Sequence, residues 1–219
     1  MMIRQETLMR ITVLGATGGV GRHLVGQAVA DGHEVTAVVR NPDRLPHERD
    51  DRLRVVRGNA LSAESLTDAV AGADAVLSGI GANGRRDPLR PASTSATAVA
   101  DAMRAAGVRR LVVVSAGTLN RSGAGQPLGV RAVSVPLRAL LKDLYADLER
   151  MEAILADSGL DWTSVRPSRL TDAPGTGRIR RIVDGGPAGL SIPRADVARA
   201  MLDVVPDAST VGRVVGVSS

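Results

Sequence analysis

Short apolar runs recur along the chain and are separated by amphipathic segments. Several runs are continuous and rich in β-branched residues, such as the run that begins at Leu111. A strand buried on both faces has this composition, whereas a half-exposed strand alternates apolar and polar residues. The runs predict strands at residues 11–15, 34–39, 53–57, 75–78, 111–115, 163–166 and 213–217.

Between the predicted strands, apolar residues recur at intervals of three and four, which is the spacing of one helix face. Gly107 follows the stripe that ends at Ala106, and Ser158 and Gly159 follow the stripe that ends at Leu155; such residues mark helix ends. The stripes are Val20, Leu24, Val25, Ala28 and Val29; Val99, Ala100, Met103 and Ala106; Leu137, Leu140, Leu141, Leu144, Leu148, Met151 and Leu155; and Val197, Ala198, Met201, Leu202 and Val205. Alternating strands and helices with right-handed connections predict an α/β fold, with a doubly wound, mainly parallel Rossmann-type sheet.

Three segments interrupt the alternation, at residues 83–95, 120–136 and 170–190, and are rich in Gly, Pro, Ser and Arg. They follow the fourth, fifth and sixth predicted strands, at the edge where open α/β sheets bind ligands. We therefore expect them to be substrate loops. No change in composition marks a domain boundary, so we expect one domain over residues 9–219 and an extension at residues 1–8.

The composition excludes several kinds of chemistry. The chain has no cysteine, which rules out disulfides, thiolate metal sites and cysteine nucleophiles. His23, His33 and His47 are not spaced as metal ligands, so no metal site is expected. No run reaches the roughly 18 apolar residues of a membrane helix, and no secretory signal opens the chain. We expect a cytoplasmic protein without a membrane partner.

The formal net charge of +5 raises the possibility of a nucleic-acid partner. Almost all of the positive charge is arginine, however, and the arginines are scattered among Asp and Glu. One Tyr and one Trp are available to stack on bases. A nucleic-acid surface clusters its charge, so we expect no nucleic-acid partner.

The most specific motif is a glycine-rich turn, Gly15-Ala16-Thr17-Gly18-Gly19-Val20-Gly21, between the first strand and the first helix. In such a turn Gly15 permits the tight bend, Gly18 lets the backbone approach a diphosphate, and Gly21 allows close helix–strand packing. The helix N-terminus then offers free N–H groups and partial positive charge to the phosphates. The turn predicts a dinucleotide site that includes Thr17, Gly19 and Val20.

The residue after the second strand bears on which dinucleotide is bound. An NAD site usually has Asp or Glu there to bind the ribose 2′-hydroxyl, but this chain has Arg40, about 20 residues after the glycine turn. A guanidinium can bind a 2′-phosphate through two hydrogen bonds. Arg40 therefore favours NADP(H) over NAD(H), and Arg44 is a second candidate.

At this point the chain resembles the atypical short-chain dehydrogenases, and more narrowly the NAD(P)H-binding group that contains NmrA-like proteins and biliverdin reductase B/flavin reductase. The resemblance runs from Met9 to the C-terminus. Its motifs are the glycine turn with Arg22, and residues 39–42, 57–60, 111–115, 158–163, 166–167 and 192–198.

The resemblance implies roles for residues at matching positions. Asn59 and Ala60 would flank the adenine, although the family more often has Asp where Asn59 stands. Ser78, Gly79, Ile80 and Gly81 would line the ribose and diphosphate. Ser115 and Ala116 would lie beside the nicotinamide, and Pro167, Ser168 and Arg169 would cover its far side.

Typical short-chain dehydrogenases use a Tyr as the acid or base, with a Lys four residues later on the same helical face. The single tyrosine of this chain is Tyr145, and the residue four later is Glu149. A carboxylate there disfavours the ionised tyrosine that a base requires. Lys142 lies three residues before Tyr145, so Tyr145 remains open as a catalytic or a packing residue.

Two carboxylates remain to be placed. We expect Asp196, at the start of the last predicted helix, to cap that helix or to interact with its dipole. The resemblance places Glu152 near a position where relatives carry a polar residue that faces the site, but we expect Glu152 to be a solvated carboxylate on the surface of its helix.

Hydride transfer to a flavin or a related conjugated acceptor does not need the Tyr–Lys pair, because solvent supplies the proton. The sequence therefore favours an NADPH-dependent reductase of a flavin, quinone or similar small acceptor, with Ser115 and Tyr145 as candidate catalytic residues. Alternatives are a non-catalytic NmrA-like redox sensor and an epimerase- or dehydratase-like enzyme. The sequence leaves monomer and homodimer open.

Overall fold

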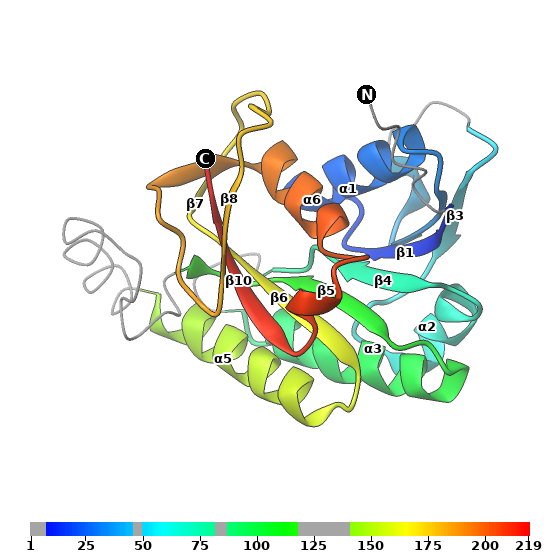
Figure 1. Ribbon diagram of the computed structural model, residues 1–219. Coiled ribbons are helices and arrows are strands. Elements are labelled where there is room, and N and C mark those ends of the chain that lie inside the picture. Colours follow the sequence, from blue (N-terminus) through cyan, green and yellow to red (C-terminus); the bar gives the residue numbers. More distant parts are fainter. Residues whose placement is uncertain (1–7, 46–49, 82–86, 118–140) are drawn as a thin grey trace.

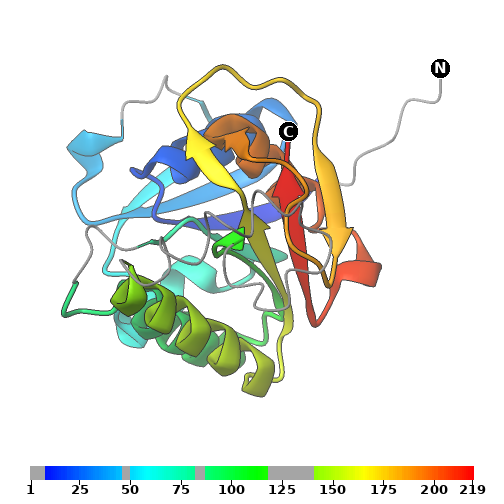
Figure 2. The same ribbon diagram turned by 90° about the vertical axis from the view of Figure 1, so that its left-hand side faces the viewer.

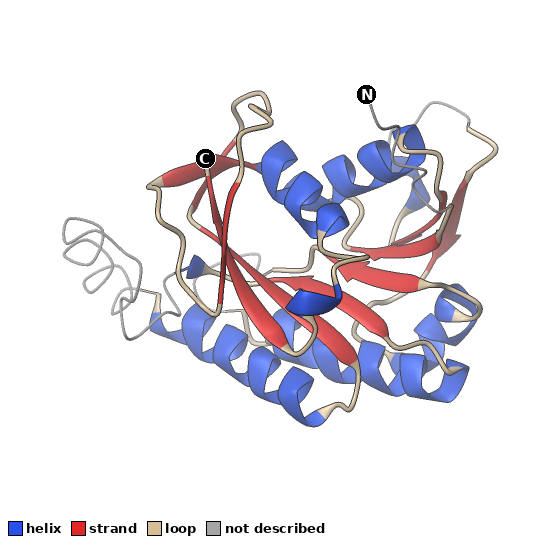
Figure 3. Cartoon of the chain, viewed as in Figure 1, coloured by secondary structure: helices blue, strands red, loops and turns tan. Residues whose placement is uncertain are grey.

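The computed structural model describes residues 8–45, 50–81, 87–117 and 141–219. They form an eight-stranded sheet in the order β3-β2-β1-β4-β5-β6-β10-β8 (Figures 1 and 3). Its strands are β1 (Arg10–Leu14), β2 (Glu34–Val39), β3 (Leu53–Arg57), β4 (Ala75–Ser78), β5 (Arg110–Val114), β6 (Asp161–Pro167), β8 (Arg180–Val183) and β10 (Arg213–Ser218). All neighbouring strands are parallel except β10 and β8. The predicted doubly wound, mainly parallel sheet is confirmed.

Helices cover both faces of the sheet (Figures 1 and 2). One face carries α1 (Gly19–Ala30) and α6 (Arg194–Asp203), and the other carries α2 (Ala63–Val70), α3 (Pro91–Ala106) and α5 (Lys142–Asp157). Successive strand residues enter opposite cores. Val13 packs with the α1–α6 side, whereas Leu14 packs with the α2–α3–α5 side. This two-sided burial explains the continuous apolar runs.

The four helical stripes correspond to α1, α3, α5 and α6. The pattern did not single out α2, whose two turns follow Ser62; the Ser62 hydroxyl accepts from the Ser65 N–H at 3.4 Å. The predicted helix start at Leu137 and the predicted loop at 120–136 lie outside the described residues. The described residues also form two 3₁₀ helices, η1 (Pro42–Arg44) and η3 (Ala208–Thr210).

The prediction of irregular structure at 170–190 was wrong in part. This region contains most of β7 (Arg169–Thr171) and all of β8, and β9 (Ser191–Pro193) follows it. The strands β7 and β9 pair in parallel as a small separate sheet. Each is three residues long, too short for a periodic pattern of apolar residues, and the Gly- and Pro-rich residues around them predict loops. Likewise α3 begins at Pro91, inside the loop expected at 83–95.

No helix in the described ranges is long and apolar enough to span a membrane.

Candidate cofactor site

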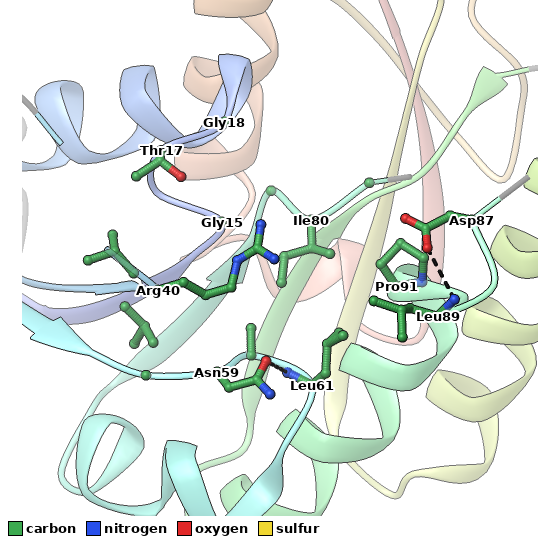
Figure 4. A pocket seen from close by; sticks show the side chains of 16 residues that line it. Gly15, Thr17, Gly18, Arg40, Asn59, Leu61, Ile80, Asp87, Leu89 and Pro91 are labelled. Atoms are coloured by element: carbon green, nitrogen blue, oxygen red, sulfur yellow. Dashed lines mark hydrogen bonds between the residues drawn. The ribbon is translucent and has the colours of Figure 1, made fainter. Parts of the chain in front are cut away.

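A pocket lies at the carboxyl ends of β1, β2, β3 and β4 and is closed by the start of α3 (Figure 4). Strand order reverses beside β1, and ligands of open α/β sheets bind at such a switch point. The lining residues are Gly15, Thr17, Gly18, Val38, Val39, Arg40, Gly58, Asn59, Ala60, Leu61, Gly79, Ile80, Gly81, Asp87, Leu89 and Pro91. Nine of these were predicted from the sequence as cofactor residues. Val39 and Gly58 belong to the motifs noted above but had no assigned role, and Leu61 and Leu89 belong to no motif.

The glycine turn leaves no room for a side chain at Gly15 or Gly21. Gly15 has a φ of +72°, and a Cβ on it would lie 3.0 Å from Ile80 Cγ1. A Cβ on Gly21 would lie 2.1 Å from the Gly15 carbonyl oxygen. The Gly18 N–H donates to the same oxygen at 2.8 Å and so closes the turn. Backbone from β1, β4 and α1 therefore meets at the floor of the pocket.

The N-terminus of α1 is suited to an anion. Gly18 is the N-cap residue and provides no side-chain cap, and the first turn contains no acidic residue. The first N–H groups of a helix have no carbonyl partner within the helix and carry partial positive charge. Gly19, Val20 and Gly21 supply this turn, and Thr17 and Gly18 face the pocket beside it.

The adenosine end of the predicted site is rich in arginine. Figure 4 shows the Arg40 side chain extending into the pocket from the end of β2. A second cleft adjoins it, lined by Thr17, Arg40, Asn41 and Arg44. The Asn41 Oδ1 accepts from the Asp43 N–H at 3.1 Å and caps η1. This cap holds the turn that brings Arg44 to the same cleft as Arg40.

Asn59 shapes the opposite wall of the pocket. Its Oδ1 accepts from the Leu61 N–H at 3.1 Å, and its own N–H donates to the Ser65 hydroxyl at 2.8 Å. These bonds fold the β3–α2 connection so that Asn59 and Ala60 line the pocket. Figure 4 shows Asn59 at this wall.

The residues predicted for the nicotinamide end lie on neighbouring strands. Ser78 ends β4 and is buried, Ser115 and Ala116 follow β5, and Pro167 and Ser168 stand at the end of β6. None of the five lines the pocket described above. Strand pairing places the β5 and β6 ends side by side, since the Ser115 N–H donates to the Val165 carbonyl at 2.7 Å.

Two of these residues carry unpaired hydroxyls. The Oγ atoms of Ser115 and Ser168 are buried and have no hydrogen-bond partner among the residues that the structure describes. A buried polar atom without a partner costs free energy, so such atoms commonly mark a place where a ligand or water binds.

Comparison with known proteins identifies the family. The model of the NAD(P)H-binding family matches residues 15–208, from the glycine turn to the start of η3. The chain belongs to this NAD(P)H-binding family. The resemblance drawn from the motifs is confirmed at this level.

Two relatives are similar to most of this chain. A Mycobacterium tuberculosis protein is 31% identical over 72% of this chain, which spans 14% of that protein. A Streptomyces 3-diazoavenalumate denitrifying reductase is 37% identical over 82% of this chain, which spans 61% of that protein. The chain thus covers less than two thirds of either relative.

Among solved structures, a short-chain dehydrogenase/reductase from Veillonella parvula in complex with NADP has a TM-score of 0.80 at 20% identity, over 96% of this chain and 94% of that chain. A Streptococcus pneumoniae protein, provisionally described as an NADH-flavin reductase, has a TM-score of 0.74 at 24% identity, over 95% of this chain and 98% of that chain. At these identities the similarity shows a shared fold.

Tyr145 lies on α5 and is 6% exposed, among the apolar residues between α5, α3 and the sheet. Lys142 begins the same helix, and Glu149 follows one turn after Tyr145. Tyr145 does not line the pocket at the glycine turn. Its surroundings favour the packing role that the sequence had left open.

Glu152 differs from its predicted role, and Asp196 differs in part. Glu152 is not solvated: its side chain is 13% exposed and pairs with Arg166 through both carboxylate oxygens, with Arg166 Nε 2.9 Å from Oε1. The Ser164 hydroxyl donates to Glu152 at 2.7 Å. The pair joins α5 to β6 just before Pro167. Periodicity alone could not show this, because the partner is on another element.

Asp196 lies in the first turn of α6, where a carboxylate interacts favourably with the helix dipole, as predicted, but the helix has no side-chain cap. The Asp196 carboxylate accepts from the Thr176 N–H at 3.0 Å, the Thr176 hydroxyl at 2.7 Å and the Gly177 N–H at 3.1 Å. Burial opposes its ionisation, but the hydrogen bonds from Thr176 and Gly177 outweigh burial and lower the pKa of Asp196. Asp196 therefore anchors the loop between β7 and β8.

Within the described ranges, no three His, Asp or Glu side chains gather in a group that could hold a metal ion.

Proposed function

We propose that this chain is an NADPH-dependent reductase that transfers hydride to a flavin, quinone or similar small conjugated acceptor. One observation carries the proposal: the pocket at the glycine turn continues into a cleft lined by two arginines, Arg40 and Arg44. The family binds NAD(P)H, and the pocket lies where that cofactor is expected.

The two arginines support NADPH over NADH. A 2′-phosphate carries about two negative charges and three acceptor oxygens, and a guanidinium binds such a group through a pair of hydrogen bonds. Among the residues that the structure describes, the lining of this cleft contains no carboxylate to receive a ribose 2′-hydroxyl. Thr17 and Asn41 add a hydroxyl and an amide beside the guanidinium groups.

The reductase assignment follows from what hydride transfer requires of the protein. When bound, the cofactor supplies the hydride, and solvent supplies the proton that completes reduction of the acceptor. The chain's own residues then bind and orient. The first turn of α1 holds the diphosphate, Arg40 holds the adenosine end, and the unpaired hydroxyls of Ser115 and Ser168 are donors for the nicotinamide or the acceptor.

The names of two similar proteins support this choice. The Streptomyces relative is a reductase, and the Streptococcus pneumoniae structure is provisionally described as an NADH-flavin reductase. The buried Tyr145, without a lysine four residues later, gives no support to the usual dehydrogenase mechanism.

The test has two stages. Calorimetry with NADPH and with NADH measures which dinucleotide binds, and tighter binding of NADPH is expected. Absorbance of NADPH is then followed in the presence of FMN, riboflavin, quinones and biliverdin. Oxidation that needs both the protein and one of these acceptors supports a reductase; tight NADPH binding with no oxidation across the panel contradicts it.

The buried Tyr145 also favours a second candidate, a non-catalytic NmrA-like sensor of the NADP(H) redox state. A sensor must bind a protein partner differently in the NADP and NADPH forms. Partner capture that changes with the cofactor's redox state, together with no turnover of any acceptor, would favour the sensor.

A further inference from the structure

The side chain of Arg194 lies against the first turn of α1. A Cβ atom on Gly19 would lie 2.6 Å from Arg194 Cδ and 2.7 Å from Arg194 Nε, so the absence of a side chain at Gly19 makes room for this arginine. Arg194 is the first residue of α6. The sequence had placed it within a family motif but had given it no role.

Packing between α1 and α6 holds Arg194 in this position. Farther along the two helices, Gln27 Nε2 donates to the Ala195 carbonyl at 2.9 Å, and Arg199 Nη1 donates to Asp31 Oδ2 at 2.5 Å. These contacts fix the start of α6 against α1. Arg194 therefore extends from a helix whose position is fixed, and not from a loop.

Two sources of positive charge meet beside Gly19. The N-terminus of α1 carries N–H groups without a carbonyl partner within the helix and a partial positive charge, and Arg194 adds a full charge. These repel each other until an anion lies between them, and a diphosphate is such an anion.

Asp172 neutralises part of this positive charge. Its Oδ1 lies 2.6 Å from Arg194 Nη1, but its side chain is 90% exposed. Solvent screens a pair of this kind, so little free energy is needed to loosen it. Arg194 itself is 28% exposed, which leaves the guanidinium accessible to a ligand.

We propose that Arg194, together with the N-terminus of α1, contacts the diphosphate of the cofactor. Asp172 then holds the Arg194 guanidinium beside Gly19 until the cofactor binds. This rests on the proposed function, since it requires a dinucleotide at the glycine turn. The diphosphate is common to NADPH and NADH, so Arg194 contributes equally to the affinity for both. Arg40, in contrast, contributes to the affinity for NADPH alone.

Calorimetry of the full chain with NADPH and with NADH tests the proposal. Arg194→Ala is expected to weaken binding of each dinucleotide by about tenfold, and Arg194→Lys to recover part of the loss. Arg104→Ala is the matched control, because it removes the same charge from an exposed pair with Asp101, 3.1 Å away on α3, and should leave both affinities unchanged.

The Gly19→Ala variant tests the contribution of Arg194 to dinucleotide affinity in a second way. The three atoms nearest to its Cβ all belong to Arg194, so the methyl group displaces the arginine. The variant should lose affinity as Arg194→Ala does, and combining both changes should add little further loss.

Wild-type affinity of Arg194→Ala for both dinucleotides, or a loss confined to NADPH, overturns the Arg194 proposal and leaves the proposed function intact. Failure of the wild-type protein to bind either dinucleotide overturns both. Thermal unfolding of each variant, measured in parallel, separates a lost contact from a lost fold.

Discussion

Asp147 of α5 accepts the backbone N–H of Ser93 of α3 at 3.2 Å, across 54 residues of sequence. The same carboxylate accepts the Ala92 N–H at 3.0 Å and the Ser93 hydroxyl. Arg90, the N-cap residue of α3, has a φ of 45° and makes no side-chain cap. A distant carboxylate therefore caps this helix, whose first residue, Pro91, forms a wall of the pocket.

Asp147→Ala is expected to destabilise the fold by about 2–3 kcal/mol, because it leaves buried first-turn N–H groups of α3 without an acceptor. Chemical denaturation measures the loss. Asp157→Ala, an exposed change at the end of α5, is the control and should alter stability little. Equal stability of both variants would show that Asp147 does not act as a cap.

Gly21→Ala should abolish dinucleotide binding or prevent folding, because its Cβ would lie 2.1 Å from the Gly15 carbonyl oxygen. Gly26→Ala, on the same helix, meets no atom within 4 Å and should be neutral or stabilising by up to about 1 kcal/mol. Thermal unfolding and NADPH titration of the pair check both expectations. A Gly21→Ala variant that folds and binds like wild type would contradict the close packing at the turn.

Arg40→Ala should weaken NADPH binding by at least about tenfold and leave NADH binding nearly unchanged, because only NADPH offers a 2′-phosphate to a guanidinium. Arg44→Ala should show the same selectivity with a smaller loss. Titration of each variant with both dinucleotides gives the ratio of the NADPH affinity to the NADH affinity. An equal loss for the two cofactors would place Arg40 at a part of the ligand that they share.

Asp196 should make the stability of the protein depend on pH. Its folded pKa lies below that of the unfolded chain, which is about 3.9. The folded state therefore binds the proton less readily, so the stabilisation is present above about pH 4 and is lost as the pH falls through the lower folded pKa.

Asp196→Asn should thus be less stable than wild type at neutral pH, and the difference should shrink as the pH falls below about 4. Urea denaturation at a series of pH values measures this. A difference that is constant with pH would mean that ionised Asp196 does not hold Thr176 and Gly177.

The sequence alone determined the features that depend on local chemistry and periodicity. Continuous apolar runs predicted strands buried on both faces, and stripes at helical spacing predicted four helices. The glycine turn was visible because its backbone path allows no side chain at Gly15 or Gly21. Arg40 could be found because its place after the second strand is set by the distance along the chain.

Tertiary structure alone decided which distant groups meet. Periodicity shows that Glu152 and Asp147 lie on a helix, but not that one pairs with Arg166 and the other caps α3. The same holds for Arg194 beside Gly19, and for Asp196 with its loop. A side chain's partner is set by how the elements pack, and residues far apart in sequence become neighbours only when the helices close on the two faces of the sheet.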